Sequence, residues 1–222
     1  MMIGTYIWIN FILFLIGYFI GSINLGIIIS KIKGQDIRLK GSGNAGATNV
    51  LRNMGFKFAF FVFSFDFFKS FLPTLIVLLT KHYANVSNND FIIPLSIGFG
   101  ALIGHVFPLY FKFKGGKGVA CFFGIVLAFN FILFVIFVSL YVLILVVSNY
   151  VSLTSAISSF IIAILCCLPL FDVDHVLAIM LVNVPVIVNN CIISLCAIVI
   201  IFKHYRNYVR IINKTESKLF KW

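Results

Sequence analysis

The stretch GVACFFGIVLAFNFILFVIFVSLYVLILVVSN, residues 118–149, contains no charged residue, and its length decides how the chain folds. Apolar runs near 20 residues are typical of helices that cross a membrane. As one helix this run would be about 48 Å long, whereas the hydrocarbon layer of a bilayer is about 30 Å thick. The run is therefore either one strongly tilted helix or two helices that meet near Asn130.

Other long apolar runs occupy residues 4–30, 56–80, 91–111, 152–171 and 176–202. The chain of 222 residues is 62% hydrophobic and only 10% charged. Soluble domains carry roughly 25% charged residues, so this composition predicts an all-α integral membrane protein. No polar stretch is long enough to fold separately, and we expect residues 1–222 to form a single membrane-embedded domain.

The distribution of basic residues decides between six and seven helices. Most of the 17 Lys and Arg residues fall in three polar segments, which we call the first (31–57), the second (112–118) and the third (203–222). Basic loops tend to stay on the cytoplasmic side of a membrane, and only a break near Asn130 places all three segments there. The sequence thus predicts seven transmembrane helices, with the N-terminus outside, the C-terminus cytoplasmic and an unusually short fourth helix near 117–128.

The first polar segment contains a dense run of glycines, hydroxyls and amides, Gly41-Ser42-Gly43-Asn44-Ala45-Gly46-Ala47-Thr48-Asn49. Its glycines allow positive φ and close approach of the backbone, and its side chains supply hydrogen-bond donors. Arg52 follows at helical distance and can present a forked pair of donors to a phosphate. The spacing fits neither a P-loop nor a dinucleotide fingerprint, and the alternative interpretation is a flexible glycine-rich loop between helices.

The second polar segment pairs Gly115 and Gly116 with Lys117 at the expected start of a helix, where free N–H groups favour an anion. Lys112 and Lys114 are equally well explained as lysines that anchor a loop at the membrane. In the third polar segment, His204 and Asn207 lie where the last helix leaves the membrane, and Ser152 could face the same surface. The alternative there is a basic collar around the helix end.

Residues inside the apolar runs are interpreted first as structural. His105 lies near the end of the apolar run 91–111, shortly before the second polar segment, and its default interpretation is a satisfied structural histidine, with a role in the site left open. Asp66 and Lys69 are three residues apart on one helix face, and charges at such a place usually pair with each other.

The sequence also excludes several classes of chemistry. It has no Gly-x-Ser-x-Gly elbow, no Ser/His/Asp pattern and only six carboxylates, so two-metal phosphoryl chemistry is disfavoured. Its five cysteines lie in apolar runs without Cys-x-x-Cys spacing, and we expect no metal or other cofactor. The net charge of +11 favours anionic lipid and anionic substrates over nucleic acid in a chain of this hydropathy. What remains is the positioning of an already activated phosphate-bearing substrate.

These motifs resemble those of the bacterial acyl-phosphate:glycerol-3-phosphate acyltransferase family (PlsY-type). The similarity rests on the run from Gly41 to Arg52 and extends through Gly21-Ser22-Ile23, Gly34-Gln35-Asp36-Ile37-Arg38, the stretch 104–118 and the stretch 204–216. It implies a seven-helix enzyme that moves a fatty acyl group from acyl phosphate to the 1-hydroxyl of glycerol 3-phosphate. The products would be lysophosphatidic acid and phosphate, in the first step of phospholipid synthesis. Asn24, Ser70 and Lys214 depart from the pattern of the family.

The resemblance also implies roles for individual residues. Catalytic roles fall to Ser42, Arg52, Lys117 and His204, of which the first three would hold phosphate and stabilise charge. Binding of substrate or phosphate falls to Gly41, Gly43, Asn44, Gly46, Thr48, Asn49, Gly115, Gly116, Ser152 and Asn207. The proton acceptor is either a phosphate oxygen of the substrate or His204.

The expected partners are acyl phosphate, glycerol 3-phosphate and membrane lipid, together with the enzyme that makes the acyl phosphate. The expected location is the bacterial inner membrane, as a multi-pass protein with its site on the cytoplasmic side. A transporter of organic phosphate is the main alternative, although it should carry polar residues at mid-membrane depth. A non-catalytic lipid-binding subunit would leave the motif of residues 41–49 unexplained, and a phosphatidyl-alcohol transferase would need metal-binding aspartates that the sequence lacks.

Overall fold

The computed structural model describes residues 2–83, 92–168 and 186–219, and each regular element within these ranges is a helix. The α-helices are α1 (Met2–Ser22), α2 (Leu25–Ile32), α3 (Ala47–Met54), α4 (Phe56–Tyr83), α5 (Leu95–Val106), α6 (Val119–Phe129), α7 (Phe131–Ser148), α8 (Val151–Leu165), α9 (Val186–Lys203) and α10 (Tyr205–Ile212). Short 3₁₀ turns occur at η1 (Ile37–Leu39) and η3 (Leu109–Phe111).

The predicted break near Asn130 is confirmed, because α6 and α7 are separate helices. Asn130 lies between them in an extended conformation, and its side chain caps α7 by accepting a hydrogen bond from the Leu133 N–H at 3.0 Å. Within the described ranges, the helical segments long and apolar enough to cross a membrane are Ile7–Ile32, which takes in most of α1 and all of α2, Phe56–Tyr83, Phe131–Ser148 and Val186–Lys203. The apolar helices α5, α6 and α8 are shorter.

The first apolar run differs from the prediction, since it is not one continuous helix. α1 ends at Ser22, and the side chain of Asn24 caps α2 by accepting from the Ile27 N–H at 3.1 Å. An amide that competes for backbone N–H groups favours a new helix start over continuation. At the other end of the chain, residues 176–185 of the last predicted helix lie outside the described ranges.

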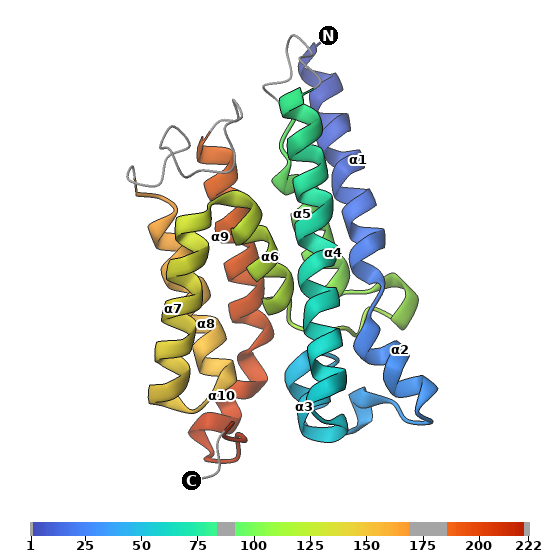
Figure 1. The fold of residues 1–222 in the computed structure, drawn as a ribbon, viewed down its shortest axis with the longest axis vertical. Helices are drawn as coiled ribbons and strands as arrows, with labels where there is room; N and C mark the ends of the chain where they lie inside the picture. The colour runs from blue at the N-terminus through green and yellow to red at the C-terminus, as the bar shows by residue number, and fades with distance from the viewer. Residues whose placement is uncertain (1, 84–91, 169–185, 220–222) are drawn as a thin grey trace.

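The long helices form two groups with α6 between them (Figure 1). α1, α4 and α5 make one group, and α7, α8 and α9 make the other. α1 and α5 pack closely because small residues face each other. A Cβ at Gly17 or Gly21 would fall on the backbone of α5, and one at Gly100 or Gly104 on the backbone of α1. Small residues at such spacing allow membrane helices to approach each other.

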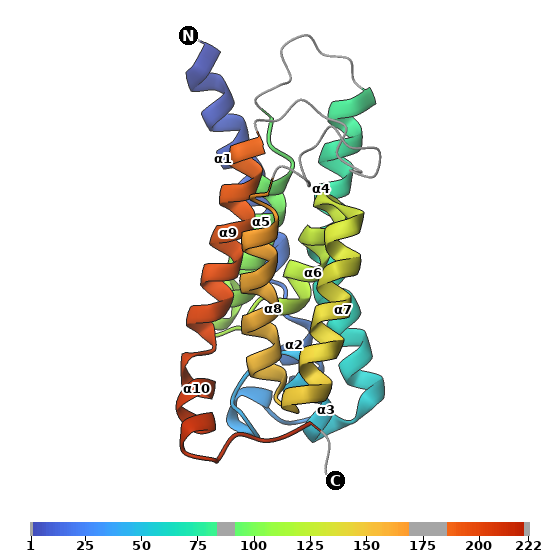
Figure 2. The ribbon, with the colours of Figure 1, turned by 90° about the vertical axis from the view of Figure 1, so that its left-hand side faces the viewer.

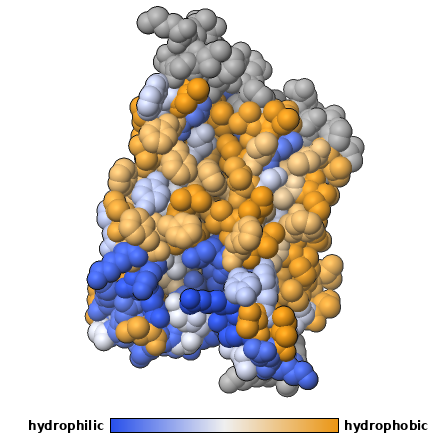
Figure 3. Space-filling model, turned by 180° about the vertical axis from the view of Figure 1, so that it is seen from behind, coloured by the Kyte–Doolittle hydropathy of each residue, from blue (hydrophilic) through white to orange (hydrophobic). Residues whose placement is uncertain are grey.

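The polar segments gather at one end of the molecule, opposite the N-terminus (Figure 2). α2, α3 and α10 are the short helices at this end, and α3 lies beside the lower end of α4. A second small core beneath the first polar segment includes Ile37, Ala45 and Val50, all fully buried. Figure 3 shows hydrophilic surface concentrated at this end, while hydrophobic side chains cover most of the face above it.

Candidate active site

A small cavity of about 110 Å³ lies where the three polar segments meet. All the predicted site residues that bear side chains line it, namely Ser42, Asn44, Thr48, Asn49, Arg52, Lys117, Ser152, His204 and Asn207, together with Gly46. A larger adjoining hollow of about 730 Å³ is lined by Gly43 and Gly115. Gly41 and Gly116 line neither space. The structure therefore assembles the predicted set, and the roles of its members stay predictions.

The first polar segment is shaped by the side chain of Asn49, which is only 1% exposed. Its amide nitrogen donates to the carbonyl oxygens of Ile37, Lys40 and Asn44 at 2.9–3.1 Å. Its amide oxygen accepts from the Ser42 N–H at 3.0 Å. Since these bonds use both ends of the amide, Asn49 organises the loop from beneath.

The loop glycines fulfil different requirements. Gly41 and Gly43 adopt φ of 56° and 72°, as predicted, and such values strain other residues. Gly46 does not use the freedom of positive φ, because its φ is −84° at the N-cap of α3. Its lack of a side chain serves close packing, since a Cβ there would lie 2.8 Å from the amide nitrogen of Asn44.

Arg52 and Ser42 bring charge and a hydroxyl to the cavity. Arg52 extends from α3 and donates from Nη2 to the carbonyl oxygen of Ser217 at 3.0 Å, so the first and third polar segments touch. Among the described residues, the hydroxyl of Ser42 has no hydrogen-bond partner, and Arg52 has no carboxylate partner in an ion pair. Both groups are therefore available to a bound anion.

Lys117 reaches the cavity from the turn that precedes α6. Gly118 caps this helix with φ of 89°, and the Lys117 ammonium donates to Oδ1 of Asn207 from α10. Burial, the largest cause, lowers the pKa of Lys117 to about 7; the charge of Glu216 opposes this shift, and the charges of Arg210 and Arg52 favour it. A bound anion would favour the charged form of Lys117.

His204 lies at the junction of α9 and α10 and is 2% exposed. Its Nδ1 is 2.8 Å from the carbonyl oxygen of Ile200, which can only accept, so the ring proton is on Nδ1. Burial and the charge of Lys117 lower the pKa of His204 to about 3. The ring is consequently neutral, and Nε2 is left as a hydrogen-bond acceptor.

Glu216 is a cavity residue that was absent from the predicted site. Its Oε1 accepts from Ser152 Oγ at 3.1 Å and from Asn207 Nδ2 at 2.7 Å, and its Oε2 accepts from Arg210 Nε at 2.6 Å. Burial opposes ionisation, but the bonds from Arg210 and Asn207 prevail and lower the pKa of Glu216. One feature of the sequence could have indicated this residue, since Glu216 is the single acidic residue in the basic third polar segment.

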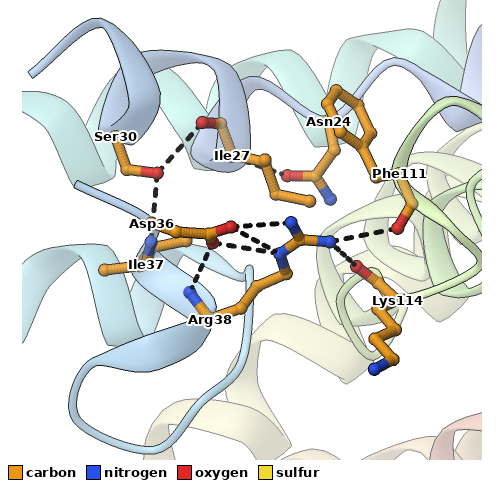
Figure 4. Close-up of polar contacts among 8 residues, drawn as sticks. All are labelled: Asn24, Ile27, Ser30, Asp36, Ile37, Arg38, Phe111 and Lys114. Carbon is orange, nitrogen blue, oxygen red and sulfur yellow. Dashed lines mark hydrogen bonds and ion pairs between the residues drawn. The ribbon is translucent and has the colours of Figure 1, made fainter. Parts of the chain in front are cut away.

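Arg38 connects the first and second polar segments (Figure 4). Its guanidinium binds the Asp36 carboxylate at 2.7–3.2 Å and donates from Nη1 to the carbonyl oxygen of Phe111 at 3.0 Å. A longer contact of 3.5 Å joins Nη1 to the carbonyl oxygen of Lys114. The hydrogen bonds from Arg38 hold the pKa of Asp36 at about 2. Arg38 therefore links the two loops, and its Nε, Nη1 and Nη2 atoms each already donate a hydrogen bond.

Part of the cavity is lined by apolar and aromatic side chains, beside the polar Asp66 and His105. Phe63 from α4, Val119 from α6 and Tyr141 from α7 line it. The ring of Phe123 stands 6.1 Å from that of Phe63 and 5.3 Å from that of Tyr141, centroid to centroid, so aromatic packing continues between these helices. The charged residues of the lining thus suit an anionic group, and this aromatic wall suits an acyl chain.

Comparisons with known proteins match nearly the whole chain. A family model described as glycerol-3-phosphate acyltransferase matches residues 11–214. The chain is 39% identical over 228 residues to a glycerol-3-phosphate acyltransferase of Mycoplasmopsis agalactiae, covering 96% of this chain and 95% of the relative. It is also similar to two crystal structures of PlsY (YgiH), an integral membrane glycerol 3-phosphate acyltransferase, at 32% identity. The TM-score is 0.78 for the glycerol 3-phosphate form, over 95% of this chain and 96% of that one. It is 0.75 for the lysophosphatidic acid form, over 95% of both.

Proposed function

This chain belongs to the glycerol-3-phosphate acyltransferase family, and we propose that its acyl donor is an acyl phosphate. The reaction would then be the transfer of a fatty acyl group to the 1-hydroxyl of glycerol 3-phosphate, giving lysophosphatidic acid and phosphate. This is the first step of phospholipid synthesis.

The observation that carries the proposal is the charge of the cavity. Lys117 and Arg52 both line it, and neither has a carboxylate partner in an ion pair among the described residues. An acyl phosphate is a mixed anhydride, so its carbonyl carbon is already activated and the enzyme needs no covalent intermediate. The positive wall would bind the phosphate that must leave, and the aromatic wall would receive the acyl chain.

The chemical step needs one attack and one proton transfer. The 1-hydroxyl oxygen of glycerol 3-phosphate bonds to the carbonyl carbon, and the bond between that carbon and the bridging phosphate oxygen breaks. The electron pair leaves with the phosphate, where Lys117 and Arg52 stabilise the charge. The hydroxyl proton ends on a phosphate oxygen, because His204, with a pKa of about 3, is too weak a base to hold it.

The other residues would orient the acceptor. His204 Nε2 accepts a hydrogen bond from the 1-hydroxyl and aims its oxygen at the carbonyl carbon. Ser42 and the N–H groups of the loop up to Thr48 hold phosphate oxygens, and Gly41, Gly43, Gly115 and Gly116 let the backbone come close. Ser152 and Asn207, fixed by Glu216, seat the glycerol moiety.

We further propose a bacterial inner membrane location, with seven transmembrane helices and the site on the cytoplasmic side. Arg52 contacts Ser217, Lys117 contacts Asn207, and Arg38 contacts Lys114, which supports one common side for the three basic segments. Basic segments favour the cytoplasm, and the M. agalactiae relative is bacterial. A contact with the enzyme that supplies acyl phosphate would occur at this end.

A direct assay tests the proposed reaction. The purified protein in lipid would be given palmitoyl phosphate, and phosphate release would be measured with and without glycerol 3-phosphate. We expect release that depends on glycerol 3-phosphate, with lysophosphatidic acid formed in equal amount. A folded protein without turnover would instead favour an anion transporter or a lipid-binding subunit, and turnover with acyl-coenzyme A alone would refute the proposed donor.

Cysteine labelling tests the membrane orientation. Single cysteines at Lys40 and Lys218, both exposed at the polar end, would be introduced into a cysteine-free chain. We expect both to react with an impermeant thiol reagent only when the cytoplasmic face is accessible, because the segments that carry them meet at one cavity. Labelling from opposite sides would contradict seven spans, and labelling of both from outside would invert the orientation.

The pH dependence of anion binding tests the state of Lys117. Its pKa of about 7 means that the ammonium charge is present below this pH and is lost above it. Sulfate keeps its charge between pH 6 and 9. Above pH 7, Lys117 must gain a proton when sulfate binds, so the inhibition constant of sulfate should rise about tenfold per pH unit. Lys117→Arg should remove this dependence, since arginine stays charged. A flat profile in the unaltered protein between pH 6 and 9 would contradict the assignment.

A further inference from the structure

A buried polar network borders the cavity next to the Lys117 turn: Asp66 and His105 line the cavity, but the reaction described above gives them no role. Asp66 and Lys69 belong to α4, His105 belongs to α5, and the three residues are 1%, 5% and 3% exposed. Charged groups within a membrane-spanning helix are costly unless they are paired and hydrogen-bonded. The expected Asp66–Lys69 ion pair is present, but it does not stand alone.

The network is centred on the Lys69 ammonium. Its Nζ lies 2.6 Å from Asp66 Oδ1, 3.0 Å from His105 Nδ1 and 3.0 Å from the carbonyl oxygen of Ile23. A lysine ammonium has three N–H groups and accepts no hydrogen bond. Asp66 Oδ1 and the Ile23 carbonyl oxygen accept two of these N–H groups, and His105 Nδ1 lies within hydrogen-bond distance of both Lys69 Nζ and Asp66 Oδ1, which is 3.1 Å away. The ion pair therefore holds this edge of the His105 ring, with Nδ1 accepting from Lys69 in one tautomer and donating to Asp66 in the other.

The far edge of the His105 ring supports the glycines before Lys117. A Cβ added to Gly116 would fall on Nε2 of the ring, so the ring lies directly against this backbone. The Gly116 N–H donates to the carbonyl oxygen of His105 at 3.1 Å. A Cβ on Gly115 would meet that same carbonyl oxygen and the ring of Pro108. The turn at Gly115 and Gly116 thus packs tightly against His105, whose ring is held by Lys69 and Asp66.

We propose that Asp66, Lys69 and His105 form a positioning network that sets the place of the Lys117 ammonium in the active site. The ion pair prevents rotation of the His105 ring, the ring supports Gly116, and Gly116 determines where Lys117 enters the cavity. The inference rests on the proposed catalytic role of Lys117, and it explains which residues hold Lys117 in position. A small displacement of a catalytic group removes much of its contribution to catalysis, so loss of the network should lower kcat.

Variants can perturb the network from three directions. His105→Leu removes both ring nitrogens at similar volume. Asp66→Asn combined with Lys69→Met removes both charges at once, so no unpaired charge stays buried. Gly116→Ala pushes the turn off the ring without altering any charge. Thr74→Val is the matched control, because Thr74 is fully buried in α4 and its hydroxyl donates to the Ser70 carbonyl oxygen at 2.7 Å, away from the turn.

The first measurement does not depend on turnover. The rate at which acetic anhydride acetylates Lys117 would be followed by mass spectrometry in folded protein, relative to exposed Lys57. Each network variant should raise this ratio about fivefold or more, because the turn opens locally, whereas Thr74→Val should leave it unchanged. An unchanged ratio in all three network variants would overturn the proposal, whether or not the protein has the proposed activity.

The second measurement is a double-mutant cycle with Lys117→Ala. Each network variant should lower kcat about 10- to 100-fold in the otherwise unaltered chain, but less than about threefold when Lys117 is already alanine. A residue that only stabilised the fold, or an Asp66 that acted directly on substrate, would cost the same factor in both backgrounds, and that result would refute the positioning role. If the unaltered protein shows no turnover, the proposed function fails, and the acetylation ratio still decides the structural claim.

Discussion

Replacing Lys117 with alanine should lower kcat at least about 10²-fold, because preorganised charge at a leaving group contributes this much or more in a buried site. Lys117 is the cation that reaches the cavity from the start of α6, and its ammonium is held by Asn207. In the proposed reaction it stabilises the phosphate that departs with the electron pair. The measurement is the steady-state rate of phosphate release by protein whose melting temperature shows that it is folded.

Lys114→Ala is the matched control for this prediction. Lys114 lies in the same turn, but it borders the larger hollow and not the inner cavity. Its replacement should change kcat by less than about threefold, because exposed charges contribute little. Lys117→Arg should keep part of the activity, since the charge remains while its position changes. Equal losses for Lys114→Ala and Lys117→Ala would mean that the general charge of the loop matters, and would remove Lys117 from the chemistry.

The helix pattern could be predicted where local signals were strong. The run of residues 118–149 was too long for one span, and an asparagine near its middle is a good N-cap, so the break at Asn130 followed from length and capping. The break at Asn24 had the same chemical signal but was missed, because the run of residues 4–30 was short enough to pass as a single helix.

The composition of the cavity could be predicted only where residue types have few alternative uses. Glycines, hydroxyls and amides beside Arg52 and Lys117 in a membrane protein indicate phosphate, and these side chains do meet. Glu216 escaped prediction because its position depends on contacts between distant residues. Ser152 is 64 positions away in the chain, and no local pattern shows that the third polar segment folds back to α8.

The buried network illustrates the same limit. The spacing of Asp66 and Lys69 indicated an ion pair, and that prediction is confirmed at 2.6 Å. The addition of His105 depends on how α4 packs against α5, which no spacing rule supplies. Likewise the sequence pattern did not show that the Asn49 amide donates to the carbonyl oxygens of the loop, because those bonds depend on how the loop folds over α3; its predicted role in substrate binding stays a prediction.

Replacing Glu216 with glutamine should lower kcat/KM for glycerol 3-phosphate about 30- to 100-fold, since it breaks a network of charge-assisted hydrogen bonds. The carboxylate accepts from Ser152, Asn207 and Arg210, whereas an amide would turn a donor toward at least one of these donors. Ser152 and Asn207 would then lose their fixed orientation at the proposed glycerol site. Arg206→Gln is the control, because Arg206 lies in α10 beside Asn207 but is exposed.

The loss in Glu216→Gln should also depend on pH in a defined direction. The charge of Glu216 raises the pKa of Lys117, so its removal lowers that pKa further and leaves less ammonium at pH 7. Protonation at lower pH restores the ammonium, and the activity of Glu216→Gln relative to the unaltered protein should therefore be several-fold higher at pH 6 than at pH 8. A ratio that is constant between these pH values would show that Glu216 acts only through the orientation of Ser152 and Asn207. A ratio that falls at pH 6 would contradict the electrostatic link between the two residues.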